Sequence, residues 1–168
     1  MFRWLFALLL SSHLAAAIAA TPGEVAEGHV LREITMDGLT GESKALSSFF
    51  GRPLIINVWA SYCPPCLAEM ASLERLSHRF HDELTVIGVS IDDHRDRALR
   101  FLDQADTGFP HFIDHQLGVE NMLGANRIPL TVLVDGSGRI LHKVYGAREW
   151  DSPEALQAIR RAFGFERR

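Results

Sequence analysis

Two cysteines separated by two prolines are the residues of this sequence best suited to chemistry. Cys63 and Cys66 are the only cysteines among 168 residues. An apolar, β-branched run precedes them, and a segment with a helical spacing of apolar residues follows them. Two thiols at this spacing can close a small disulfide ring and open it again. We therefore expect redox chemistry at the start of a helix.

The two thiols are expected to play different parts. The reactive form of a thiol is the thiolate, and Cys63 stands just before the helix, where free N–H groups and the helix dipole favour an anion. Cys66 lies one turn further in and should be less accessible. We predict that Cys63 attacks a disulfide and that Cys66 resolves the mixed disulfide. Because Pro64 and Pro65 have no N–H to donate, we expect moderate thiolate stabilisation and a dithiol that gives up electrons readily.

The first twenty residues predict export. Residues 1–20 begin with one basic side chain, contain no charged residue from position 4 onward, and end in an alanine-rich stretch. This pattern is typical of a secretory signal peptide cleaved near Ala19 or Ala20, the alternative being an uncleaved membrane anchor. We therefore expect an extracytoplasmic, periplasmic location. A static disulfide in that setting usually joins distant segments, whereas a bridge across three positions closes a tiny loop and stabilises the fold little.

The remaining chain predicts one α/β domain. Residues 21–28 form a polar lead-in and residues 29–168 the domain, in keeping with the length and a hydrophobic content of 47%. A net charge of −4 gives no reason to expect nucleic acid as a partner.

Strands are predicted by short apolar or alternating runs, at residues 29–36 (an edge strand), 54–59, 84–91, 109–113, 130–134 and 140–145. Helices are predicted by helical spacing and caps, at residues 64–80, from Asp92 or Asp93 as cap to about 104, at 116–123, and at 153–163 behind Ser152, with a helical turn at 47–51. This alternation predicts a sandwich with a mixed sheet.

Two segments resemble a known family. Residues 59–70 (Trp-Ala-Ser-Tyr-Cys-Pro-Pro-Cys-Leu-Ala-Glu-Met) resemble the active-site segment of TlpA/ResA-like thiol–disulfide reductases of the thioredoxin superfamily. Residues 127–135 (Arg-Ile-Pro-Leu-Thr-Val-Leu-Val-Asp) resemble the cis-proline loop and following strand of that superfamily. The resemblance implies a thioredoxin-like three-layer sandwich, with a mixed central sheet, flanking helices and an inserted helix–strand unit between residues 91 and 113.

The resemblance also implies how clients bind. It implies that Pro129 is cis and faces the disulfide, whereas the residues alone leave an ordinary trans proline equally open. The backbone of Ile128 would then lie beside the cysteines and pair with an extended client segment. Tyr62 could offer an aromatic surface to a client, while Trp59 is expected to pack in the core beneath the site.

Glu69 is the candidate proton carrier. It lies three residues after Cys66, and the resemblance implies burial near the disulfide, which would raise its pKa and let it exchange protons with Cys66. The alternative is an exposed glutamate favoured by the helix N-terminus. Thioredoxin has a buried aspartate at the position of Asn57. The amide of Asn57 cannot titrate. Ala71 stands where the family often has a helix-kinking proline, which leaves the depth of Glu69 open.

The sequence therefore predicts an exported thiol–disulfide reductase without a cofactor, since no nicotinamide or flavin motif is present. The resemblance implies disulfide-containing clients such as apocytochrome c, as in cytochrome c maturation, and a membrane thiol donor of the DsbD/CcdA type. A disulfide oxidant or isomerase remains the alternative, because only the reduction potential decides the direction.

A copper-binding chaperone is the alternative outside enzymes. It would need histidines beside the cysteines, as in Sco-like proteins, but those use a wider cysteine spacing. His111 falls on a predicted strand, so it and His115, four residues later, lack the helical face that this spacing needs, and His78 and His81 lie near a helix end. We predict no metal site.

Overall fold

The computed structural model describes residues 21–165, so the expected signal or anchor segment lies outside the described residues. Its strands are β1 (Thr35–Gly38), β2 (Lys44–Ala45), β3 (Leu54–Trp59), β4 (Thr85–Ser90), β5 (His111–Ile113), β6 (Leu130–Val134) and β7 (Ile140–Tyr145). Its helices are the 3-10 helix η1 (Leu46–Phe49) and the α-helices α1 (Pro64–Arg79), α2 (Arg95–Ala105), α3 (Gly118–Leu123) and α4 (Pro153–Phe163). None of the helices within residues 21–165 has the length and apolar character needed to cross a membrane.

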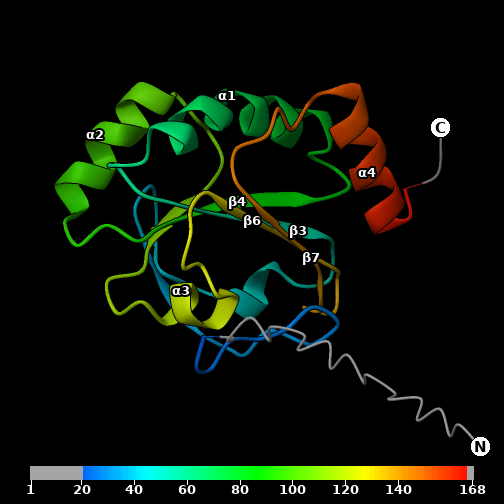
Figure 1. Ribbon diagram of the computed structural model, residues 1–168, viewed down its shortest axis with the longest axis horizontal. Helices are drawn as coiled ribbons and strands as arrows, with labels where there is room; N and C mark the ends of the chain where they lie inside the picture. The colour runs from blue at the N-terminus through cyan, green and yellow to red at the C-terminus, as the bar shows by residue number, and fades with distance from the viewer. Residues whose placement is uncertain (1–20, 166–168) are drawn as a thin grey trace, which may run out of the picture.

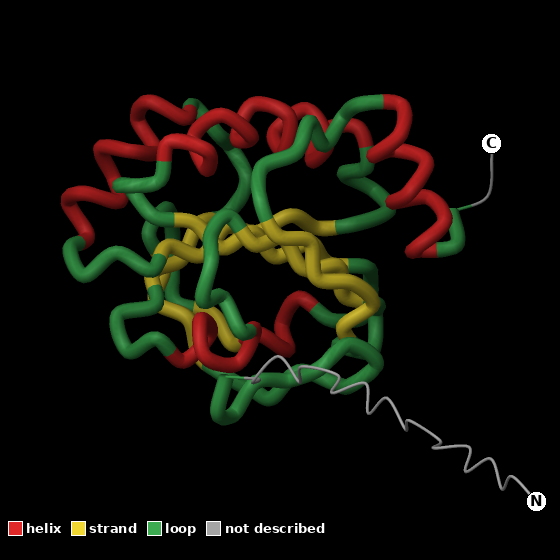
Figure 2. The backbone as a smooth tube through the Cα atoms, in the orientation of Figure 1, coloured by secondary structure: helices red, strands yellow, loops and turns green. Residues whose placement is uncertain are grey.

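The strands form one mixed sheet in the order β2-β1-β5-β4-β3-β6-β7. The central strands β3, β4 and β5 run parallel, and β6, β7, β1 and β2 join by antiparallel pairing. Figure 1 shows α1, α2 and α4 on one face of the sheet and α3 on the other. Figure 2 shows the same three layers. This is the expected thioredoxin-like sandwich, with α2 and β5 as the inserted helix–strand unit.

Strand β3 explains how the two faces are built. All six of its residues are buried, as expected for a strand covered on both sides. Successive side chains point to opposite faces, so Leu54, Ile56 and Val58 pack in the core beneath α3. Ile55 and Trp59 pack in the core beneath α1, α2 and α4. The alternation therefore directs Asn57, a polar residue, toward α1.

The prediction of an edge strand at residues 29–36 is wrong in position. The strand β1 begins at Thr35, and β2 pairs on its outer side, so β2 forms the edge of the sheet. The segment before Thr35 instead lies alongside the turn between β6 and β7. Leu31 donates its N–H to the carbonyl of Gly138 at 2.8 Å, and Val30 makes an isolated bridge with Arg139.

The predicted caps give one success and one error. Ser152 caps α4 as expected, since its hydroxyl accepts the N–H of Ala155 at 3.2 Å. The prediction that Asp92 or Asp93 caps α2 is wrong, because the N-cap is His94 and it makes no side-chain cap bond. The carboxylate of Asp92 instead accepts hydrogen bonds from Ser61 and Ser90, near the ends of β3 and β4.

Gly88 in β4 provides a test of the core behind the active site. A Cβ at this position would lie 2.9 Å from Trp59 Nε1 and 2.5 Å from His111 Cε1. We expect Gly88→Ala to lower the free energy of unfolding by about 1–3 kcal/mol, because the overpacked core must shift. The matched control is Gly41→Ala, where a Cβ meets nothing within 4 Å. Urea denaturation measures both variants, and equal stabilities would contradict the packing described here.

Candidate active site

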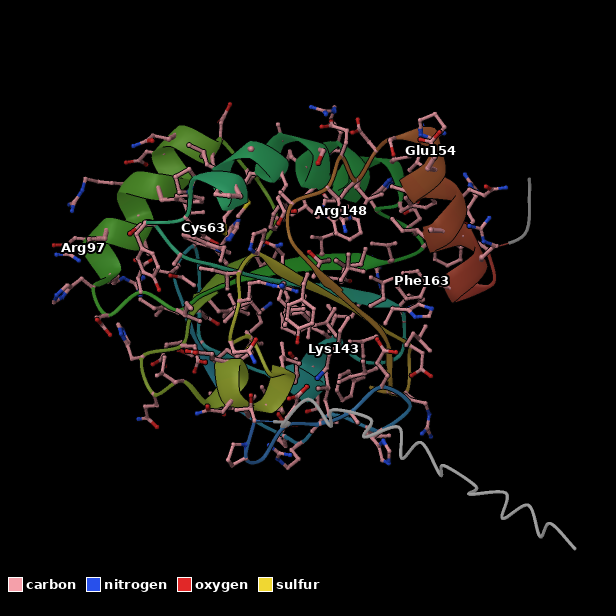
Figure 3. All side chains as sticks on the ribbon, viewed as in Figure 1. Cys63, Arg97, Lys143, Arg148, Glu154 and Phe163 are labelled. Carbon is pink, nitrogen blue, oxygen red and sulfur yellow. A yellow bond between two sulfur atoms is a disulfide. The ribbon has the colours of Figure 1, made fainter. Side chains whose placement is uncertain are left out.

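The cysteine pair lies where β3 ends and α1 begins. Cys63 is the N-cap of α1, Pro64 and Pro65 occupy its first turn, and Cys63 and Cys66 are joined by a disulfide. Figure 3 shows Cys63 at this end of the helix, on the side nearest α2. Prolines fit here because the first N–H groups of a helix have no partner within the helix. The local sequence therefore places both sulfurs at the open end of α1.

The two sulfurs differ in exposure. Cys63 is 7% exposed and Cys66 is fully buried. The Cys63 sulfur accepts a hydrogen bond from the N–H of Cys66 at 3.2 Å. The prolines between them donate nothing. An approaching disulfide would therefore meet Cys63 first, and one backbone N–H faces its sulfur.

Asp92 fixes the loop that enters the active site. Its carboxylate accepts the N–H of Ser61 at 2.8 Å, the hydroxyl of Ser61 at 2.6 Å and the hydroxyl of Ser90 at 2.7 Å. Our sequence reasoning missed this role, although a signal was present. Because β3 and β4 were predicted as neighbouring buried strands, Ser61 and Asp92, which follow them, could have been expected at one edge of the sheet.

Glu69 lies in the interior beside α1. It is 1% exposed, so Ala71 does not prevent its burial on the continuous helix α1. One carboxylate oxygen, Oε1, accepts the amide N–H of Asn57 at 2.7 Å. The other, Oε2, accepts the backbone N–H of Arg148 at 3.1 Å and the indole N–H of Trp150 at 3.0 Å. Burial raises the pKa of Glu69, while the hydrogen bonds from Trp150, Asn57 and Arg148 partly oppose that rise.

Asn57 completes the surroundings of this carboxyl group. Its Nδ2 also donates to Thr131 Oγ1 at 3.0 Å, and its buried Oδ1 has no partner among the described residues. An amide turned by 180° exchanges its donor and acceptor atoms. In that orientation Oδ1 can accept a hydrogen bond from the O–H of neutral Glu69. The amide is thus suited to either protonation state of the carboxyl group.

The loop between β7 and α4 closes over Glu69. The Ser72 hydroxyl donates to the carbonyl of Glu69 at 2.8 Å and accepts the backbone N–H of Trp150 at 3.0 Å. Arg75 on α1 pairs with Glu149 and Asp151 of the same loop. The contribution of Trp150 was missed, because a contact across 81 positions leaves no local pattern in the sequence.

The proline loop lies at the same end of β3 as the cysteines. The Ile128–Pro129 peptide bond is cis, as the resemblance implied. Leu130, which follows, pairs with Val58 near the end of β3. Ile128 is half-buried and Pro129 is buried. The topology therefore brings this loop to the sheet edge from which the cysteines emerge.

The two aromatic residues near the motif have different environments. Tyr62 is 67% exposed, which leaves its ring accessible to a partner. Trp59 is fully buried and stacks on Phe101 with ring centroids 4.4 Å apart, which fits the expected core packing.

The histidines do not gather at the cysteines in the described structure. His111 is buried, and burial lowers its pKa to about 3, so it is neutral. His78 pairs with Glu74 on the exposed side of α1. Within residues 21–165, no three His, Cys, Asp or Glu side chains are grouped so that they could hold a metal ion.

A sandwich of this topology, with a Cys-X-X-Cys disulfide at the start of its first long helix and a cis-proline beside the same sheet edge, defines a thioredoxin-fold oxidoreductase. The Redoxin family matches residues 26–159, and the chain belongs to that family. Within it, the chain is a thiol–disulfide oxidoreductase of the ResA/DsbE type.

Two relatives agree with this assignment, and a solved structure shares the fold. Over 132 residues the chain is 32% identical to the thiol–disulfide oxidoreductase ResA of Halalkalibacterium halodurans, covering 78% of this chain and 72% of ResA. It is 33% identical to the thiol:disulfide interchange protein DsbE of Vibrio cholerae, covering 73% of this chain and 68% of DsbE. A crystal structure of a protein assigned as DsbE, from Chlorobium tepidum, superposes with a TM-score of 0.76 at 24% identity, covering 83% of this chain and 99% of that one.

The environment of Glu69 predicts a pH dependence of stability. Because its pKa is raised in the folded protein, the unfolded chain loses this proton at lower pH than the folded chain does. The contribution of Glu69 to stability is therefore complete below its unfolded pKa and decreases as pH rises through the folded value. Relative to Glu69→Gln, the oxidised wild type should lose stability as pH rises above about 4.5.

Urea denaturation of the oxidised protein across this pH range measures the difference. Glu154→Gln, on the exposed start of α4, controls for the loss of a surface carboxylate. A difference between wild type and Glu69→Gln that is constant, or that grows with pH, would contradict a raised pKa.

Proposed function

We propose that this protein is an extracytoplasmic reductase that passes two electrons from the Cys63–Cys66 dithiol to disulfides of client proteins. The observation that carries the proposal is the arrangement of Cys63, which is 7% exposed, a fully buried Cys66 and a buried Glu69 one helical turn beyond it. The first residue can meet a client, the second is protected from one, and the third can hold a proton.

The reaction proceeds in two exchanges. The Cys63 thiolate attacks one sulfur of the client disulfide, which breaks that bond and releases the first client thiolate. Cys66 then loses its proton to the Glu69 carboxylate and attacks the Cys63 sulfur of the mixed disulfide. That step forms the Cys63–Cys66 bond and releases the second client thiolate. The client has gained two electrons, its two thiolates take up protons from water and from Glu69, and the enzyme dithiol is oxidised.

Client contact is assigned to the surface around the disulfide. The Ile128 backbone, held beside cis-Pro129, would pair with an extended client segment by strand addition. Tyr62 would contact the client through its exposed ring, whose surface suits a partner that is apolar in part.

The direction of electron flow rests on the weak stabilisation of the Cys63 thiolate. Strong oxidants owe their potential to a thiolate that is stabilised in the reduced protein. Here Pro64 and Pro65 have no N–H to offer, and the N–H of Cys66 faces the sulfur. A poorly stabilised thiolate favours the disulfide form of the enzyme, which makes the dithiol reducing.

The sequence and the relatives support a proposal for the cellular setting. The segment 1–20 has the pattern of a signal peptide or membrane anchor, and ResA and DsbE are named as thiol–disulfide oxidoreductase and thiol:disulfide interchange protein. We infer a periplasmic location, apocytochrome c as a candidate client in cytochrome c maturation, and a membrane thiol donor of the DsbD/CcdA type to restore the dithiol.

The reduction potential of the Cys63–Cys66 couple tests the direction. Equilibration of the mature protein in a defined thiol buffer should give a value below about −250 mV. A value above about −150 mV would reverse the assignment and make the protein an oxidant or isomerase.

The roles of the two cysteines are tested by trapping. Cys66→Ser should accumulate a mixed disulfide with a disulfide-containing peptide, because Cys63 can attack but nothing resolves the product. Cys63→Ser should trap far less, since Cys66 is buried. Intact-mass spectrometry under non-reducing conditions measures both, and equal trapping by the two variants would refute the assignment.

A further inference from the structure

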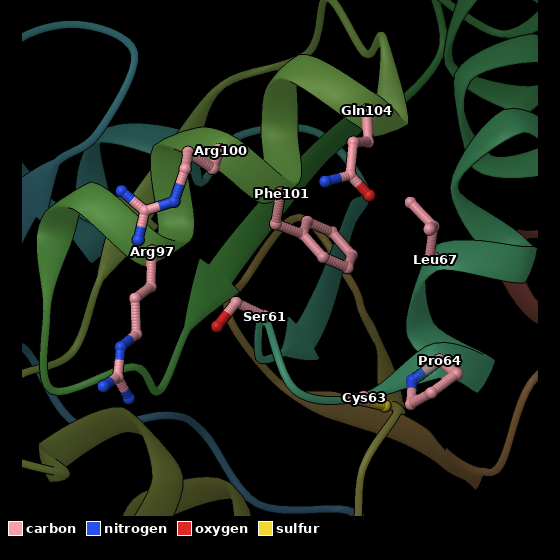
Figure 4. A pocket seen from close by; sticks show the side chains of 8 residues that line it. All are labelled: Ser61, Cys63, Pro64, Leu67, Arg97, Arg100, Phe101 and Gln104. Carbon is pink, nitrogen blue, oxygen red and sulfur yellow. The ribbon is translucent and has the colours of Figure 1, made fainter.

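A groove beside Cys63 separates α1 from α2. It has a volume of about 470 Å³. Leu67 and Phe101 project into it from the two helices, as Figure 4 shows. Arg97 and Arg100 line its α2 side. Because Cys63 lines this groove, a client segment next to its target sulfur would meet this surface.

The arginines and aspartates of α2 differ in their position relative to the groove. Arg97, Arg100 and Gln104 recur at helical spacing and line it, whereas Asp96 and Asp103 are seven residues apart on the same helix and do not. Both groove arginines are exposed, and neither has an ion-pair partner in the part of the chain that the structure describes. The groove wall therefore presents two guanidinium groups to a partner.

Carboxylates also lie close to Tyr62, the residue before Cys63. Burial raises the pKa of the Tyr62 phenol, and the carboxylates of Asp92, Glu120 and Asp93 raise it further. Two neighbouring surfaces of unlike charge can set the orientation of a bound chain, because like charges brought together are unfavourable. An acidic segment in the groove therefore favours contacts with Arg97 and Arg100 over contacts near these carboxylates.

We propose that this groove binds an acidic, extended segment of the client chain adjacent to its target cysteine. The proposal rests on the reductase function proposed above and names the client chemistry that the function would select. The apolar floor of Leu67 and Phe101 takes one side chain of the segment, and Arg97 and Arg100 pair with its carboxylates. Guanidinium groups suit this task because they are weakly hydrated and bind carboxylates through two parallel hydrogen bonds.

The test compares synthetic peptides that contain one intramolecular disulfide. Three peptides of one length carry glutamate, glutamine or lysine next to the cysteines. Their reduction by the dithiol enzyme is followed as kcat/KM at low and at high ionic strength. The variant is the double substitution Arg97→Gln and Arg100→Gln. The control is Arg161→Gln, which removes an exposed arginine from α4, a helix that lies away from α2 in Figure 3.

The double variant should reduce the glutamate peptide about three- to tenfold less efficiently than wild type, in line with the loss of two exposed ion pairs. Its activity on the glutamine peptide should stay within about twofold of wild type, and Arg161→Gln should match wild type on both peptides. High salt should remove the advantage of the glutamate peptide. An equal loss on the glutamate and glutamine peptides, or an equal effect of Arg161→Gln, would overturn the proposal.

A binding measurement separates this proposal from the reductase function. A glutamate peptide with serines in place of its cysteines is titrated into the oxidised protein and followed by NMR. Chemical-shift changes at Leu67 and along α2 that vanish in the double variant would support the groove proposal. If wild type nevertheless failed to reduce the glutamine peptide, that result would count against the reductase function and not against the groove. Absence of such shifts in wild type would overturn the groove proposal, whatever the activity.

Discussion

The central position of β3 is the constraint on which the active site depends. It pairs in parallel with β4 and antiparallel with β6, and all its residues are buried. Each part of the site leaves this trio of strands at one edge. The cysteines follow β3, Asp92 follows β4, and cis-Pro129 precedes β6. The pairing of β3 with β4 and β6 thus sets the position of the two sulfur atoms.

A cluster of buried polar side chains accompanies this arrangement on the α1 side of the sheet. Alternation along β3 turns Asn57 toward α1, and the helical spacing of α1 turns Glu69 toward Asn57. A buried carboxyl group is costly unless its oxygens are hydrogen-bonded. Three donors, from Asn57, Arg148 and Trp150, meet that need. The cluster thus keeps a titratable group one helical turn from Cys66 while preserving a packed interior.

The sequence predicts those features whose cause is local. The apolar run of β3, the periodicity of α1 and the Ser152 cap each lie within a few neighbouring positions, and so does the Cys63–Cys66 motif. The two-residue strand β2 carries too little pattern to be recognised, since it is defined by pairing with β1. Asp92 was assigned to the wrong partner because its position also suits a helix cap. Trp150 could not be placed at all, because only the folded chain brings it to Glu69.

The contacts of the β7–α4 loop carry a consequence for the order in which the molecule is assembled. The backbone of Arg148 and the indole of Trp150 lie 79 and 81 positions after the carboxyl group that they bind. Because the chain is synthesised from its N-terminus, the cysteine pair is made well before Arg148 and Trp150. Until the C-terminal part docks, Glu69 has neither donor and is open to solvent. If Glu69 carries protons as proposed, the thiols of a half-made chain would therefore lack the proton carrier that the finished fold supplies.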